Sequence, residues 1–243
     1  MSVFQRGDVS IYYEVRGTGF PLLLLALGGM NSTISFWNRA SFNPIEVFSG
    51  EFSTIAMDQR NAGSSSGPLD MADPWGSYAD DQLELMYHLG IDKFHVLGHC
   101  IGGPFILSLV QRAPERVASA VIVQSIGISD ENREELPRSL YTRWAAEQPK
   151  KRSDVDLETA EAFGARMFSG DFVFSVSREF VKSCTTPLLV LPGDNNHHPK
   201  SIGLEIQSLA QNAELLEEWR APSSVVPTAV ARIKSFLKAH TPK

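Results

Sequence analysis

A cysteine within a glycine-rich segment is the residue best suited to chemistry in this chain. The segment Gly98-His99-Cys100-Ile101-Gly102-Gly103 directly follows the short apolar run 94–97. A nucleophile on a tight strand-to-helix turn has a strained backbone, and only small residues fit two positions before and after it. Gly98 and Gly102 stand at those positions, and the positive end of the following helix would favour a thiolate. We therefore predict that Cys100 is a nucleophile; the alternative is an inert buried cysteine.

Two adjacent histidines, His197 and His198, are the next candidates for chemistry. A thiol, with a pKa of about 8.5, reacts readily at neutral pH when a helix terminus or an imidazole helps to ionise it. The pair precedes Pro199 in a polar loop, and we take His198 as the first choice for the proton acceptor and His197 as the second. Adjacent loop residues seldom reach one metal ion together, and no Cys/His cluster lies nearby, so we predict no metal and no cofactor. A polar surface loop is the competing interpretation.

Apolar runs alternate with segments of helical periodicity along the chain. This alternation predicts an α/β fold with a mostly parallel central sheet flanked by helices. In such sheets ligands bind beyond the carboxyl ends of the strands, where the loops carrying Cys100 and the two histidines emerge. The predicted strands are 9–15, 22–27, 52–57, 94–97, 117–123 and 187–191, with a short last strand near 214–218, and the predicted helices are 77–89, 101–113, 203–210 and 225–239.

One interval breaks the alternation. Residues 128–180 are charged, rich in helix formers and free of strand-like runs. We predict a core made of 1–127 and 181–243 with a small helical cap insert at 128–180. Trp37 and Trp144, together with Gly29, are candidates for lining a substrate pocket beneath that insert, although core packing is the simpler role for each tryptophan.

The bulk composition excludes several classes of protein. The chain has 243 residues, of which 43% are apolar and 21% charged, and a net charge of −6. This charge gives no reason to expect nucleic acid or an anionic membrane as partner. The two cysteines are too few for a disulfide framework, no signal pattern opens the chain, and no run reaches the roughly 18 apolar residues of a membrane span. We expect a cytoplasmic protein that acts on a small-molecule substrate.

Three further segments, taken with the cysteine turn, resemble the α/β-hydrolase superfamily over nearly the whole chain. Leu27-Gly28-Gly29-Met30 is similar to the His-Gly motif that begins the oxyanion loop, with Gly28 in place of the histidine. The segment Asp58-Gln59-Arg60-Asn61-Ala62-Gly63-Ser64-Ser65 is similar to the family's Asp-x-Arg-Gly-x-Gly-x-Ser loop. The run 187–193 looks like the strand leading into the acid loop. The resemblance implies an α/β-hydrolase fold.

The same resemblance assigns roles and shows departures from the family's triad. It places the nucleophile at Cys100, as in the dienelactone hydrolase branch, and the oxyanion hole at the backbone N–H groups of Ile101 and Met30. The usual acid position falls on Asn196, while Asp194 lies two residues early. The usual histidine position, between residues 218 and 224, contains no histidine.

Two functions remain open at this point. The first is a cofactor-free hydrolase that cleaves a small ester, lactone or thioester through Cys100, with His198 or His197 moving protons and Asp194 as a possible acid. The second is a catalytically degenerate protein of the same fold that binds or regulates through a small ligand. The missing histidine and Asn196 favour the second function, whereas the cysteine turn favours the first.

Overall fold

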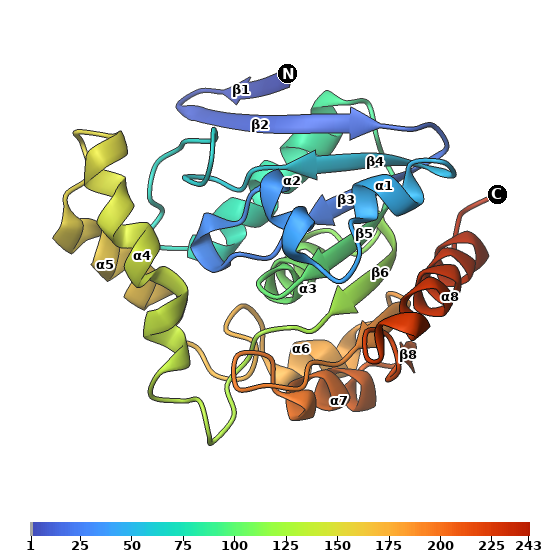
Figure 1. Ribbon diagram of the computed structural model, residues 1–243. Helices are drawn as coiled ribbons and strands as arrows, with labels where there is room; N and C mark the ends of the chain where they lie inside the picture. Colours follow the sequence, from blue (N-terminus) through green and yellow to red (C-terminus); the bar gives the residue numbers. More distant parts are fainter. Residues whose placement is uncertain (1) are drawn as a thin grey trace.

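The computed structural model describes residues 2–243 and contains one eight-stranded sheet (Figure 1). The strand order is β1-β2-β4-β3-β5-β6-β7-β8. The pairs β1–β2 and β2–β4 are antiparallel, and all others are parallel, which confirms the predicted fold class. The strands are β1 Ser2–Arg6, β2 Val9–Arg16, β3 Phe20–Leu25, β4 Phe52–Met57, β5 Phe94–His99, β6 Val117–Val123, β7 Leu188–Leu191 and β8 Ala213–Leu215.

Helices cover both faces of the sheet because its central strands are apolar on both faces. In β3, Leu23 and Leu25 pack into one core and Leu22 and Leu24 into the other, as the two-residue period of a strand requires. Residues of α2, α3 and α7 belong to the first core, and residues of α1 and α8 to the second. The helices are α1 Pro44–Phe48, α2 Pro74–His88, α3 Gly102–Arg112, α4 Leu136–Lys151, α5 Leu157–Met167, α6 Arg178–Ser183, α7 Lys200–Leu209 and α8 Val226–Ala239, with short 3₁₀ turns η1 Gly29–Asn31, η2 Ile34–Arg39 and η3 Ser223–Val225.

Helices α4 and α5 lie in the interval where the sequence predicts a helical insert. Figure 1 shows both beyond the carboxyl ends of the parallel strands. The helix α4 is joined to the loop after β4, since the indole N–H of Trp144 donates to the carbonyl of Asn61 at 2.9 Å and the side-chain amide of Gln148 donates to the same oxygen. Asn61 has a positive φ of 59°, which turns its carbonyl toward α4. These two hydrogen bonds hold α4 against the loop after β4.

The same loop is fixed from below by a buried ion pair. The guanidinium of Arg60 donates two hydrogen bonds to the carboxylate of Asp81 on α2, at 2.6 and 2.7 Å. Both side chains are almost fully buried. A bidentate pair of this kind holds its backbone firmly, because removing either partner would leave a buried charge without compensation.

No helix among the described residues is long and apolar enough to cross a membrane.

Acid is expected to destabilise this fold through a buried histidine of β5. The imidazole of His95 hydrogen-bonds to the hydroxyls of Ser119 and Thr241, at 2.8 and 3.0 Å, and burial lowers its pKa to about 4. The unfolded chain takes up this proton below its usual pKa of about 6.5, whereas the folded chain does so only near 4, so stability is lost as pH falls through that window. One such histidine contributes up to about 1.4 kcal/mol per pH unit.

Urea denaturation of wild type and His95→Gln at pH 7 and pH 5 measures this effect. The variant should be less stable at pH 7, because it loses these hydrogen bonds, yet its free energy of unfolding should fall less between the two pH values. An equal fall in both proteins would contradict the assignment.

Candidate active site

Cys100 occupies a strained turn between β5 and α3. Its φ is +62°, a left-handed conformation that residues with a side chain rarely adopt. A Cβ on Gly98 would lie 2.5 Å from the carbonyl oxygen of Gly102, and a Cβ on Gly102 would lie 2.5 Å from that of Leu25. The two glycines are therefore required by space, as the sequence predicts. The turn is also tied to β6, since the Cys100 N–H donates to the carbonyl of Val123 at 3.0 Å.

The thiol of Cys100 is neutral at neutral pH in this environment. The residue is 9% exposed, and burial raises its pKa. The nearby backbone N–H groups of Gly28, Ile101 and Gly29 lower this pKa but do not outweigh the burial. The expectation of a stabilised thiolate is therefore wrong for the resting protein, because desolvation outweighs the dipoles of the helix end and the oxyanion loop. A base is needed to remove the proton.

These N–H groups are the backbone donors near the sulfur. The N–H of Ile101, predicted for the oxyanion hole, is one of them. Those from the loop after β3 are Gly28 and Gly29. The side chain of Met30 is buried in the core and Met30 does not line the cavity at Cys100, so the role of its backbone N–H stays a prediction. The positive φ of Gly29, 57°, and the nearby carbonyl of Leu140 leave no room for a side chain at that position.

A cavity of about 550 Å³ opens above Cys100. Gly29, His197 and His198 line it together with the sulfur, so the structure brings these predicted site residues together. Trp37 and Trp144 do not line it. Both are buried, and Trp144 instead anchors α4 through its hydrogen bond to the loop after β4.

His198 has the protonation pattern of a general base. The side-chain oxygen of Asn195 accepts hydrogen bonds from the backbone N–H groups of His197 and His198, both at 3.1 Å, and it lies 3.1 Å from His198 Nδ1. Backbone N–H groups can only donate, so the Asn195 atom is the oxygen and Nδ1 must carry the proton toward it. On the neutral ring Nε2 is then the unprotonated atom. It is buried and has no hydrogen-bond partner among residues 2–243.

Burial keeps this imidazole neutral over a wide pH range. It lowers the pKa of His198 to about 4, and the nearby His197 and Arg220 act in the same direction. His197, by contrast, is exposed, and no side-chain acceptor orients its ring. Of the two histidines, His198 is therefore the one whose ring is held by a side chain, and which of them moves protons stays a prediction.

Asn195 is the site residue that the sequence reasoning missed. An asparagine followed two and three residues later by N–H groups that its side chain accepts is an Asx-type turn, and the pattern Asn-x-x-His-Pro was the signal available. Asp194, proposed as the acid, is exposed and forms an ion pair with Arg220. It makes no hydrogen bond to either histidine. Asn196 contributes only its backbone carbonyl, which accepts from the Asn132 side chain at 2.7 Å.

A tryptophan and an arginine fill the segment after β8 where a histidine was sought. The indole N–H of Trp219 donates to the carbonyl of Pro192 at 2.8 Å, and its ring meets His99 edge-on, with centroids 6.3 Å apart. His99 itself is buried, and burial lowers its pKa to about 3. The side chains of this segment thus pack against the loop after β7 and the Cys100 turn. His197 and His198 are the histidines that line the Cys100 cavity, and the Nε2 atom of His198 is buried.

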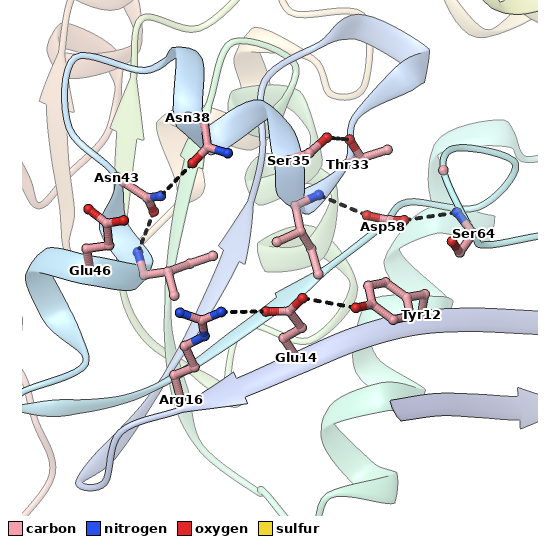
Figure 2. A pocket seen from close by; sticks show the side chains of 13 residues that line it. Tyr12, Glu14, Arg16, Thr33, Ser35, Asn38, Asn43, Glu46, Asp58 and Ser64 are labelled. Carbon is pink, nitrogen blue, oxygen red and sulfur yellow. Dashed lines mark hydrogen bonds and ion pairs between the residues drawn. The ribbon is translucent and has the colours of Figure 1, made fainter. Parts of the chain in front are cut away.

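A second cavity of about 500 Å³ is lined by residues of β2, η2, α1 and the loop after β4 (Figure 2). There Asp58 accepts hydrogen bonds from the backbone N–H groups of Ile34 and Ser64, both at 2.9 Å. A Cβ on Gly63 would lie 2.1 Å from the same carboxylate. Burial raises the pKa of Asp58, but its oxygens are engaged in fixing η2 to this loop. Within the described residues no group of acidic, histidine or cysteine side chains is arranged to hold a metal ion.

Sequence comparison places this geometry in a known family. The profile described as alpha/beta hydrolase fold matches residues 21–164. The chain belongs to this family. The match contains the cysteine turn, the loop after β4 and the helices α4 and most of α5.

Individual members of the alpha/beta hydrolase fold family are similar to parts of the chain. A protein provisionally named carbamate hydrolase RutD, from Azorhizobium caulinodans, is 34% identical over 127 residues, which are 51% of this chain and 44% of that protein. A fluoroacetate dehalogenase from a Burkholderia species is 32% identical over 124 residues, 49% of this chain and 39% of that protein. The chain therefore matches less than half the length of these relatives.

Solved structures of alpha/beta hydrolase fold proteins match over nearly the whole chain. The meta-cleavage product hydrolase CumD from Pseudomonas fluorescens IP01, as a serine-to-alanine mutant complexed with acetates, superposes with a TM-score of 0.72 at 20% identity, covering 99% of this chain and 98% of that one. The enol-lactonase from Burkholderia xenovorans LB400 gives 0.70 at 18% identity, covering 98% and 100%. At such identities the likeness establishes the fold.

Proposed function

We propose that this protein hydrolyses a small ester, lactone or thioester through a covalent thioester on Cys100. The observation that carries the proposal is one cavity lined by both Cys100, whose sulfur has three backbone N–H groups nearby, and His198, whose Nε2 is buried and unprotonated. These are a nucleophile, an oxyanion site and a base, the parts that acyl transfer needs. The combination of Cys, His and Asn is also the set used by papain-like proteases on another fold.

The acylation step follows from these positions. His198 Nε2 accepts the thiol proton while the sulfur attacks the substrate carbonyl carbon. The carbonyl electrons move to oxygen, and the N–H groups that face the sulfur stabilise that oxyanion, with about 3 to 4 kcal/mol for one such donor. When the intermediate collapses, the C–O bond of the ester, or the C–S bond of a thioester, breaks and the leaving group takes the proton from His198. The acyl group remains on Cys100 as a thioester.

Deacylation repeats the sequence with water. His198 Nε2 accepts a proton from water, the hydroxide oxygen bonds to the acyl carbon, and the C–S bond to Cys100 breaks. The sulfur recovers the proton and the carboxylic acid leaves. No hydrogen bond joins Nε2 to the sulfur in the resting structure, and such contacts often tighten only when substrate is bound. The carbamate hydrolase and fluoroacetate dehalogenase names of the relatives agree with hydrolysis as the overall reaction.

The second candidate function, a small-ligand binding protein, also has a specific observation in its favour. Trp219 and Arg220 occupy the segment where the family's histidine was expected, and the thiol has a raised pKa. A protein that binds without reacting would keep the cavity and the fold and would show no turnover.

Mass spectrometry with a chromogenic ester separates the two candidates. With 4-nitrophenyl butyrate the protein should release 4-nitrophenolate, and acid-quenched samples should carry a butyryl group on the peptide that contains Cys100. Cys184→Ala is the matched control, because Cys184 is buried outside the cavity. Release of 4-nitrophenolate no faster than in the uncatalysed reaction would favour the binding protein, if the ester also raises the melting temperature of the protein.

A further inference from the structure

The cavity above Cys100 has a cationic lining in a protein that is acidic as a whole. Arg39, Arg143 and Lys151 line it, and none of the three forms an ion pair within residues 2–243. Glu147 also lines it: Lys150, paired with it at 3.1 Å, lowers the pKa of this carboxylate most, and Lys151 and Arg143 lower it further, so the lining holds three cations and one carboxylate. The net charge of the chain is −6, so the local charge has the opposite sign to the overall charge. Clefts of one sign concentrate ligands of the other sign.

One of these cations, Arg39, packs against an aromatic ring that lines the same cavity. The Arg39 guanidinium carbon lies 4.8 Å from the centre of the Phe36 ring. The Phe36 ring packs against Gly28, because a Cβ added to Gly28 would lie only 3.2 Å from carbon atoms of that ring. The N–H of Gly28 in turn lies near the Cys100 sulfur, so Phe36 and Gly28 link Arg39 to the part of the cavity that holds Cys100.

Arg143 and Lys151 are presented by α4. The cavity-lining residues Ser139, Arg143, Glu147 and Lys151 follow one another at intervals of four, so they form a single stripe along this helix. The helix cannot turn this stripe away, because Trp144 is hydrogen-bonded to the loop after β4. The polar stripe therefore faces the cavity.

We propose that the preferred acyl substrate carries a carboxylate at the end remote from its reacting carbonyl, and that Arg39, Arg143 and Lys151 bind it. This inference rests on the proposed hydrolase function and adds the substrate class. A guanidinium presents paired N–H donors that match the two oxygens of a carboxylate. The volume of about 550 Å³ accommodates a small dicarboxylic half-ester.

A pair of esters that differ only in charge tests the inference. The substrates are the mono-4-nitrophenyl ester of adipic acid and the same ester of adipic monoamide, in which a neutral amide replaces the carboxylate. Wild type should prefer the anionic ester about tenfold in kcat/KM, the size of one charge-assisted hydrogen bond. This ratio should fall with added salt, since the cations are exposed.

Variants of the lining locate the effect. Arg39→Gln and Arg143→Gln should each bring the ratio of the two kcat/KM values toward one. Arg138→Gln removes an exposed cation of the same helix that does not line the cavity, and it should keep the wild-type ratio. A wild-type ratio near one, or an equal change in Arg138→Gln, would overturn the inference.

A binding measurement keeps the inference separate from the proposed reaction. Calorimetric titration of the Cys100→Ala variant with adipate and with adipamide needs no turnover. Tighter binding of adipate that is lost with Arg143→Gln supports the anion site even if neither ester is hydrolysed, in which case only the hydrolase proposal fails. Equal affinity for the two ligands would overturn the anion site whatever the esterase result.

Discussion

Replacing Cys100 with alanine is expected to lower kcat/KM for 4-nitrophenyl butyrate by about 10³-fold or more, because removal of a covalent nucleophile leaves only binding and the oxyanion site. The cavity, the turn and the three N–H groups would remain, since alanine has less bulk than cysteine and the same backbone requirement. The loss should therefore appear mainly in kcat. Stopped assays at several substrate concentrations give the two constants separately.

Two controls make this result specific. Cys184→Ala removes the other thiol, which lies outside the cavity, and should retain wild-type turnover. Circular dichroism and melting temperature of Cys100→Ala should match those of wild type. A folded Cys100→Ala variant that keeps its esterase activity would show that another group performs the chemistry and would end the proposal.

The central fold could be predicted from sequence because its strands are buried on both faces. Runs such as Leu22–Leu25 are entirely apolar, and such runs followed by helical segments have few structural alternatives. The edge strand β1 was not predicted. Of its residues only Phe4 is buried, so its pattern lacks the hydrophobic signal, and its place depends on antiparallel pairing with β2.

The candidate site could be predicted only where a local rule fixes it. The glycines around Cys100 follow from the sterics of one turn, and the position of His198 follows from the loop after a parallel strand. The raised pKa of the thiol does not, because it depends on how completely α4 and the loop after β3 exclude water. The anchoring role of Trp144 likewise depends on a carbonyl 83 residues away in the chain.

The contacts of Asn195 are another feature of the candidate site that could not be predicted from the sequence. The family resemblance points to Asp194 and Asn196, because it sets the acid by its spacing from a glycine. The structure uses the intervening residue, since only its side chain folds back onto the N–H groups of His197 and His198. An amide in this place orients the imidazole without supplying a negative charge. That suffices for a thiol, which is more acidic than a hydroxyl and needs less help to lose its proton.

If the proposed function holds, the pH profile of wild-type turnover should report this neutral base. Nε2 of His198 must be unprotonated to act, and burial lowers its pKa to about 4. Activity should therefore persist as pH falls through 6.5, where an ordinary histidine would be lost, and decline only near pH 4. Circular dichroism at each pH must accompany the assay, because the fold itself loses stability over this range.

Replacing His198 with glutamine is the second large effect, with an expected loss of about 10² to 10⁴-fold in kcat, the contribution of a general base. Glutamine retains a hydrogen-bonding side chain of similar reach but cannot accept the thiol proton. Turnover would then depend on the thiolate formed by solvent, so the residual rate should rise about tenfold per pH unit up to the raised pKa of Cys100. Wild type should show no such slope between about pH 6 and 8. A purely structural role for His198 would lower the rate without creating this slope.

His197→Gln is the matched control, since His197 lines the same cavity but no side chain orients its ring, and it should change kcat by less than about tenfold. The reverse result, with the slope appearing in His197→Gln, would exchange the two roles, and its absence from both variants would mean that no histidine of this loop takes the proton.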